Sequence, residues 1–150
     1  MLSKVKSFID RILVESIEIS DTSDDIQLAA SLLLVEVMNA DHKVDAREER
    51  IVQTALKNLF NLTDEDVREV FEIAKEHAKD VIPLQKYTSI LNNVLEPAAK
   101  LKLLEQIWRV VFSDDEVDKY EEHLVRQIAE LLYIRHSDFI LARQRARGET

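Results

Sequence analysis

The sequence contains no cysteine and almost no glycine or proline. Among 150 residues there are one glycine and two prolines. Without cysteine there is no disulfide, no thiolate metal site and no cysteine nucleophile. Antiparallel hairpins need turn residues at short intervals, and phosphate-binding loops need glycine where the backbone approaches the ligand. Because the single glycine, Gly148, lies close to the end of the chain, the composition argues against both and predicts an all-helical protein.

Charge and hydropathy limit the class of partner. The formal net charge is −9, from 29 acidic and 20 basic residues. A surface of this sign repels nucleic acid and suits cations or basic partners. The longest apolar stretch, Leu28 to Val35, is far shorter than the roughly 20 residues that span a bilayer, and no apolar leader follows the first residues. We expect a soluble, cytoplasmic protein with no transmembrane segment and no nucleic-acid partner.

Apolar side chains recur at helical spacing along the chain and predict about seven to eight helices. The first covers residues 2–13, and the next, Ile26 to Met38, is apolar on every face and is expected to be buried. Thr63, with Asp66 three residues later, is typical of a helix start. Asp45, Asp118 and Ser137 are predicted to open three further helices, and Pro83 and Pro97 are predicted to lie in the first turns of two more. The expected fold is all-α, a compact bundle forming one domain over residues 1–150.

An internal repeat divides this domain. When the chain is shifted by 73 residues, acidic positions and apolar positions match at the same offset. The matched units cover about residues 24–80 and 97–147, so the bundle is predicted to carry an internal two-fold repeat. Helices 26–39 and 98–112 are expected to be central and least exposed, because both are apolar on nearly all faces. The matched carboxylates are Asp41 with Asp114, Asp45 with Asp118, and Glu48 with Glu121.

These six carboxylates form two short acidic segments, each between predicted helices. Clustered carboxylate oxygens suit a hard divalent cation such as Ca²⁺ or Mg²⁺, and their spacing matches the second half of an EF-hand loop. The first half does not match, because Val37 and Val110 stand where the first loop Asp belongs. The Asp-x-x-Glu spacing is also typical of helix capping. Capping alone, and capping together with weak cation binding, both remain open.

The same segments carry a resemblance to a known family. The runs Ala40–Glu48 and Ser113–Glu121 resemble the signature of the tellurite-resistance TerB family, which is also similar to the N-terminal domain of the membrane-anchored co-chaperone DjlA. The likeness covers roughly residues 24–147 and includes the final Ala142–Ala146. It implies an all-helical fold with internal pseudo-symmetry, acidic loops and a role in stress-response or membrane-associated assemblies. It implies no established catalytic activity, and this chain lacks the glycine that follows the first Asp of each loop.

Our main hypothesis is a non-enzymatic TerB-like helical module. Its acidic loops bind divalent cations weakly, mediate protein interactions, or do both. No catalytic residue and no cofactor other than a divalent cation, Ca²⁺ or Mg²⁺, is expected; the partner is a protein, including one at a membrane, or a second copy of the chain. The alternative is a metal-dependent enzyme, a hydrolase, that uses one acidic cluster. The predicted metal ligands are Asp41, Asp45, Glu48, Asp114, Asp118 and Glu121.

Two further features concern the C-terminal half. Four arginines, Arg135, Arg143, Arg145 and Arg147, make the end of the chain basic. They either complement the negative end of a helix dipole or contact an anionic partner, the acidic loops of another copy included. Trp108 falls in the middle of a predicted buried helix and is expected in the core.

Overall fold

The computed structural model describes residues 23–38, 46–60, 62–76, 83–113 and 119–148. Over these ranges it contains seven α-helices and no strand, so the predicted all-α class is confirmed. The predicted helix over residues 2–13 lies outside the described residues. Among the described helices, none has the length and apolar content needed to cross a membrane. In chain order the helices are α2 (Ser23–Met38), α3 (Ala46–Phe60), α4 (Asp64–Glu76), α5 (Leu84–Val94), α6 (Pro97–Val111), α7 (Lys119–Leu131) and α8 (His136–Ala146).

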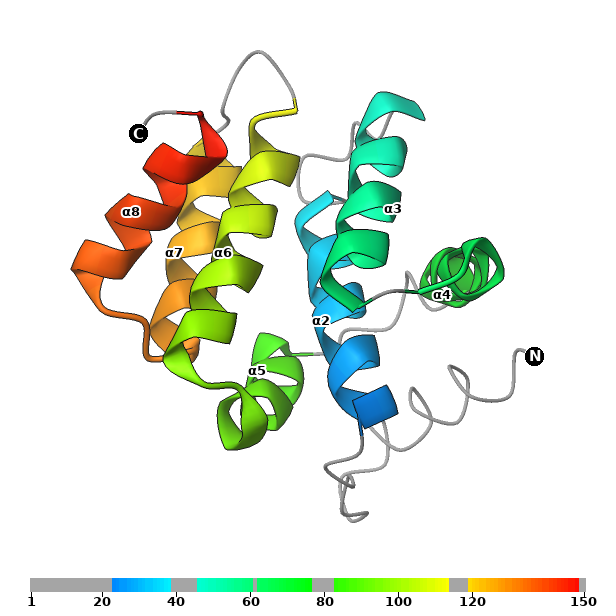
Figure 1. The fold of residues 1–150 in the computed structure, drawn as a ribbon, viewed down its shortest axis with the longest axis horizontal. Helices are drawn as coiled ribbons and strands as arrows, with labels where there is room; N and C mark the ends of the chain where they lie inside the picture. The colour runs from blue at the N-terminus through cyan, green and yellow to red at the C-terminus, as the bar shows by residue number, and fades with distance from the viewer. Residues whose placement is uncertain (1–22, 39–45, 61, 77–82, 114–118, 149–150) are drawn as a thin grey trace.

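Helix α2 forms the centre of the bundle. Every residue from Leu28 to Val35 is buried, and the helix contacts α3, α4, α5, α6 and α7. Figure 1 shows it between α6 and α7 on one side and α3 and α4 on the other. A helix that is apolar on every face exposes hydrophobic surface wherever it is left uncovered. Burying one Leu or Val side chain is worth about 1.5–3 kcal/mol, so the central position is strongly favoured.

Helix α6 is the second central element, but it is amphipathic. It contacts α2, α3, α7 and α8, and Leu104, Ile107 and Trp108 on its inner face are fully buried. Lys102 and Arg109 on its outer face are exposed. The predictions of a central α6 and of a core Trp108 are therefore confirmed, while the expectation that α6 is apolar on nearly all faces is wrong. Lys102 and Arg109 keep this face in water.

The helix starts agree in part with the predicted caps. Thr63 Oγ1 accepts a hydrogen bond of 3.1 Å from the backbone N–H of Asp66, at the start of α4. Pro97 occupies the first turn of α6 as predicted. Pro83 instead immediately precedes α5 as its N-cap, with an extended ψ of 140°, and the helix begins at Leu84. Ser137 does not open α8, because the helix begins one residue earlier, at His136. Asp45 and Asp118 lie outside the described residues.

The helix order agrees with the predicted repeat, although the third helices pack differently. Helices α2 and α6 end at Met38 and Val111, and α3 and α7 begin at Ala46 and Lys119, so both pairs keep the offset seen in the sequence. Helix α8 packs mainly along α6, whereas α4 contacts both α2 and α3. In Figure 1, α4 is seen almost end-on while α8 lies across the view. Superposition of the two units stays a prediction.

Aromatic side chains hold α8 against α6. The Trp108 ring stacks on Phe112 with centroids 5.3 Å apart and meets Phe139 of α8 edge-on at 5.4 Å. Two of the C-terminal arginines lie over these rings: Arg143 is 5.5 Å from the Trp108 centroid, and Arg147 is 4.8 Å from that of Phe112. These two arginines therefore contribute to packing within the chain.

The end of α7 is held by side chains from two other helices. Asn92 of α5 donates a hydrogen bond of 2.7 Å to the backbone carbonyl of Leu131, and Lys100 of α6 donates one of 2.9 Å to that of Leu132. Leu131 is the last residue of α7 and Leu132 follows it, so the helix itself supplies no donor to either carbonyl. Tyr133 follows with a positive φ of 56° and is 80% exposed. Tyr133 therefore occupies the left-handed position just after a helix, where glycine is the usual residue.

Replacing Tyr133 with glycine is expected to stabilise the protein. A left-handed conformation destabilises a residue that has a Cβ atom by about 1–2 kcal/mol, and glycine avoids this cost. Glycine also makes the unfolded chain more flexible, which offsets about 0.5–1 kcal/mol of the gain. Tyr133→Gly should therefore raise the free energy of unfolding by about 0.5–1 kcal/mol, measured by urea denaturation. Tyr133→Ala keeps the Cβ atom and should give no gain. An equal gain in both variants would contradict the role of the backbone.

Removing the Arg143 guanidinium is expected to loosen α8. A cation over a buried aromatic ring is worth about 0.5–2 kcal/mol, so Arg143→Met should lower the free energy of unfolding by that amount. Trp108 is the chain's one tryptophan, and its fluorescence reports the transition directly. Arg145→Met, at an exposed position of the same helix, is the matched control and should change stability little. Equal losses in the two variants would contradict a specific contact with the Trp108 ring.

Candidate functional site

The structure describes two of the six predicted metal ligands. Glu48 lies in the first turn of α3, where the backbone is described, and Glu121 lies in the first turn of α7 with 5% of its surface exposed. The predicted cation site therefore stays a prediction. The remaining four ligands, which lie outside the described residues, are Asp41, Asp45, Asp114 and Asp118.

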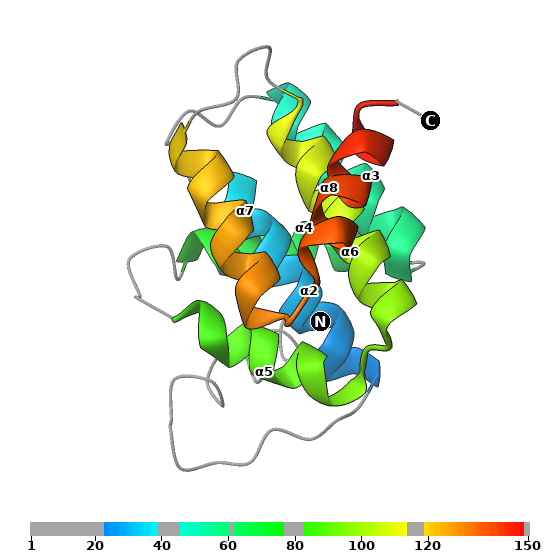
Figure 2. The same ribbon diagram turned by 90° about the vertical axis from the view of Figure 1, so that its left-hand side faces the viewer.

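The helix ends beside the two acidic segments lie at the same end of the bundle. Helices α2 and α6 end there and α3 and α7 begin there, at the top of Figure 1, and Figure 2 shows the same arrangement after a quarter turn. The N-termini of α3 and α7 each carry a partial positive charge from the aligned peptide dipoles. This field favours carboxylates in the first turns of both helices.

Acidic residues next to these positions are held by contacts of their own. Glu122 forms an ion pair of 3.3 Å with Arg126 one turn later in α7. Glu49, in the first turn of α3, is half-buried. Among the residues that the structure describes, no three histidine, aspartate or glutamate side chains gather closely enough to hold a metal ion. His123 and His136 are exposed.

A groove between α3 and α4 is the feature that the sequence analysis missed. It has a volume of about 380 Å³. Its apolar lining comes from Val67 and Phe71 of α4, and its remaining lining is polar or charged. The spacing of Glu49, Gln53 and Lys57 places them on one face of α3, which the sequence shows, but the groove also depends on how α4 crosses α3. Its polar lining residues are Glu49, Gln53, Lys57, Asp64, Arg68 and Glu72.

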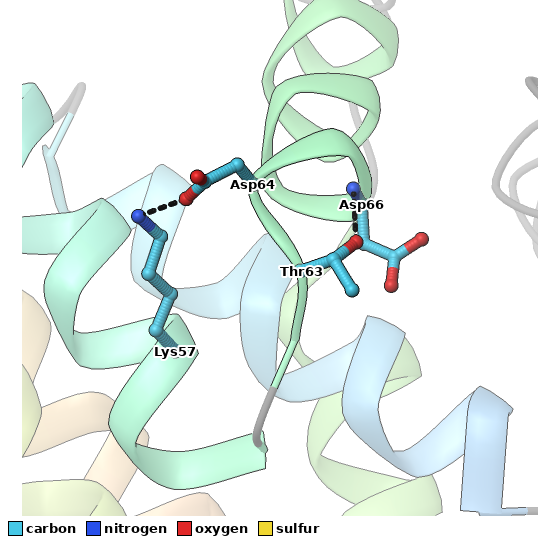
Figure 3. A network of polar contacts seen from close by, with 4 residues as sticks. All are labelled: Lys57, Thr63, Asp64 and Asp66. Carbon is cyan, nitrogen blue, oxygen red and sulfur yellow. Dashed lines mark hydrogen bonds and ion pairs between the residues drawn. The ribbon is translucent and has the colours of Figure 1, made fainter.

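An ion pair closes the groove where α3 is followed by α4. Lys57 Nζ contacts the Asp64 carboxylate, and Figure 3 shows this pair beside the Thr63–Asp66 helix cap. The hydrogen bond from Lys57, together with its charge, lowers the pKa of Asp64 below the ordinary value. Asp64 therefore stays ionised as the pH falls toward the aspartate range. Because 43% of the Lys57 side chain and 78% of the Asp64 side chain are exposed, the pair adds little stability and mainly fixes the rim of the groove.

The C-terminal arginines divide into two sets. Arg143 and Arg147 lie over aromatic rings, as described above, and Arg135 forms an ion pair of 3.5 Å with Asp138. Arg145, in the last turn of α8, is exposed and is available to a partner. The dipole explanation for the basic helix end is therefore incomplete, because stacking on α6 also accounts for two of the arginines.

Comparison with known proteins places this architecture in a family. The family described as tellurite resistance protein TerB matches residues 27–144, a range that includes most of α2 and α8 and all of the helices between them. No curated protein and no solved structure gives a significant match to the chain. The matched range covers well over half of the 150 residues. The chain belongs to the tellurite resistance protein TerB family.

Proposed function

We propose that the chain is a non-enzymatic TerB-like helical module whose two acidic segments bind divalent cations weakly. The bound cations present a charge-dependent surface to a protein partner in a stress-response or membrane-associated assembly. The predicted ligands are Asp41, Asp45 and Glu48 in one segment and Asp114, Asp118 and Glu121 in the other. Membership of the TerB family supports the coarse assignment as a helical module of tellurite-resistance type.

The position of the flanking helix ends is the observation that carries this proposal. The ends of α2 and α6 and the starts of α3 and α7 lie at one end of the bundle (Figures 1 and 2). Two carboxylate-rich segments that leave from one end concentrate negative charge there. This charge repels itself, and a divalent cation removes part of the repulsion.

The expected affinity is low. Neither segment supplies the first Asp of an EF-hand loop, so water must complete the coordination shell. We expect a dissociation constant no better than about 10⁻⁴ M, the weak end of known calcium loops. At 10 mM cation, roughly 100-fold above that constant, the stabilisation would be at most about 2.7 kcal/mol.

Thermal melting tests the proposal. The melting temperature is compared in calcium chloride, magnesium chloride and sodium chloride at equal ionic strength. The wild-type chain should melt higher in the divalent salts, and this rise should shrink in Asp41→Asn/Asp114→Asn, because these two residues are the ones that helix capping does not need. Glu65→Gln/Glu72→Gln makes the same change in net charge at exposed positions of α4 and should keep the rise.

Two results would contradict cation binding. Equal melting in all three salts would leave helix capping as the sole role of the acidic segments. An equal loss of the rise in both double variants would show that the cations act on net charge alone. Neither result would change the assignment of the chain to its family.

A further inference from the structure

Two helices of opposite net charge, α4 and α8, lie on opposite sides of the molecule. Helix α4 carries six acidic and two basic residues, while residues 135–147 around α8 carry four arginines and one aspartate. In Figure 1, whose horizontal direction is the longest axis, these two helices lie at opposite ends of the molecule. An acidic face and a basic face that point in opposite directions are complementary between copies.

The groove beside α4 has the chemistry that accepts an arginine side chain. Val67 and Phe71 provide apolar lining, and Glu72 provides an exposed carboxylate. The charged side chains around the groove sum to −1; they are Glu49, Lys57, Asp64, Arg68 and Glu72. An arginine buries its methylene stem along apolar surface and keeps its guanidinium at a polar rim. The Lys57–Asp64 pair already neutralises one carboxylate at the end of the groove, which leaves Glu72 as the acceptor for an arginine.

Helix α8 offers such a side chain on its outer surface. Arg145 is exposed, and Leu141, one turn earlier on the same face, is half-buried. Arg143 and Arg147 contact Trp108 and Phe112 and thereby fix α8 on α6. Arg145 is thus carried by a helix whose position is set by packing, which lowers the entropic cost of docking.

We infer that the α3–α4 groove of one copy binds the Arg145 end of α8 of a second copy, so that the chain associates head to tail. In a pair joined by one such contact, one groove and one α8 end stay unused. Such a heterologous contact continues from copy to copy. The net charge of −9 opposes association at a distance, but beyond about 8 Å that repulsion is screened at physiological ionic strength.

Sedimentation velocity over a concentration series from micromolar to millimolar tests this contact. The wild-type chain should show a mean mass that rises continuously past that of a dimer. Association should weaken roughly tenfold or more between 0.05 and 0.5 M sodium chloride, because charge pairs at the rim are screened. A monomer at every concentration, or a dimer that does not grow further, would overturn the inference.

Charge-reversal variants identify the two surfaces. Arg145→Glu and Glu72→Arg should each abolish self-association, because one removes the docking side chain and the other reverses the groove. A mixture of these two variants should associate again as an alternating chain, because the groove of each variant is complementary to the α8 end of the other. The double variant Arg145→Glu/Glu72→Arg should associate again.

The matched controls lie outside the contact. Lys102→Glu on α6 and Glu65→Arg on α4 make the same charge changes at exposed positions and should associate like the wild-type chain. Circular dichroism checks that all variants remain helical. Loss of association in the controls as well, or failure of the mixture to form a complex, would overturn the inference. The docking contact uses none of the predicted cation ligands. A negative result for self-association can therefore be told apart from a negative result for cation binding.

Discussion

The burial of α2 on all of its faces is the constraint on which the rest of the fold depends. The run from Leu28 to Val35 is apolar except for Ser31 and is buried throughout, and five other helices contact α2. The small side chains of Ala29 and Ala30 are fully buried and leave room for neighbouring backbones to approach. With α2 enclosed, its end at Met38 and the end of α6 come to the same side of the bundle. The helix ends that flank the two acidic segments are brought together by that packing.

Local patterns in the sequence predicted the features that depend on neighbouring residues. The all-round apolar pattern predicted α2, and the Thr63–Asp66 spacing predicted the cap of α4. Features that depend on how helices cross were missed: the α3–α4 groove, and the arginines that lie over the aromatic rings of α6. Tyr133 was missed for another reason, because a left-handed residue that is not glycine leaves no pattern in the sequence. Four of the six predicted ligands lie outside the described residues, so the cation site stays a prediction.

The two proposals assign different physics to different parts of the molecule. At the end of the bundle where α3 and α7 begin, clustered carboxylates respond to the valence of the cation, since a divalent ion can bridge several oxygens. The attraction between complementary charges on α4 and α8 weakens as the ionic strength rises, whichever salt supplies it. A change of calcium or magnesium at constant ionic strength should therefore affect the first surface and leave the second unchanged. The two proposals can therefore be tested separately on the same chain.

The pairing of the two acidic segments at one end of the bundle is the central claim, and a residue-resolved titration tests it most directly. Amide proton–nitrogen correlation spectra are recorded while calcium replaces sodium at constant ionic strength. The account predicts that signals from the first turns of both α3 and α7 shift together, with one shared binding curve, while those of α4 and α8 stay in place. Shifts at neither helix start, or shifts spread evenly over all the helices, would contradict it.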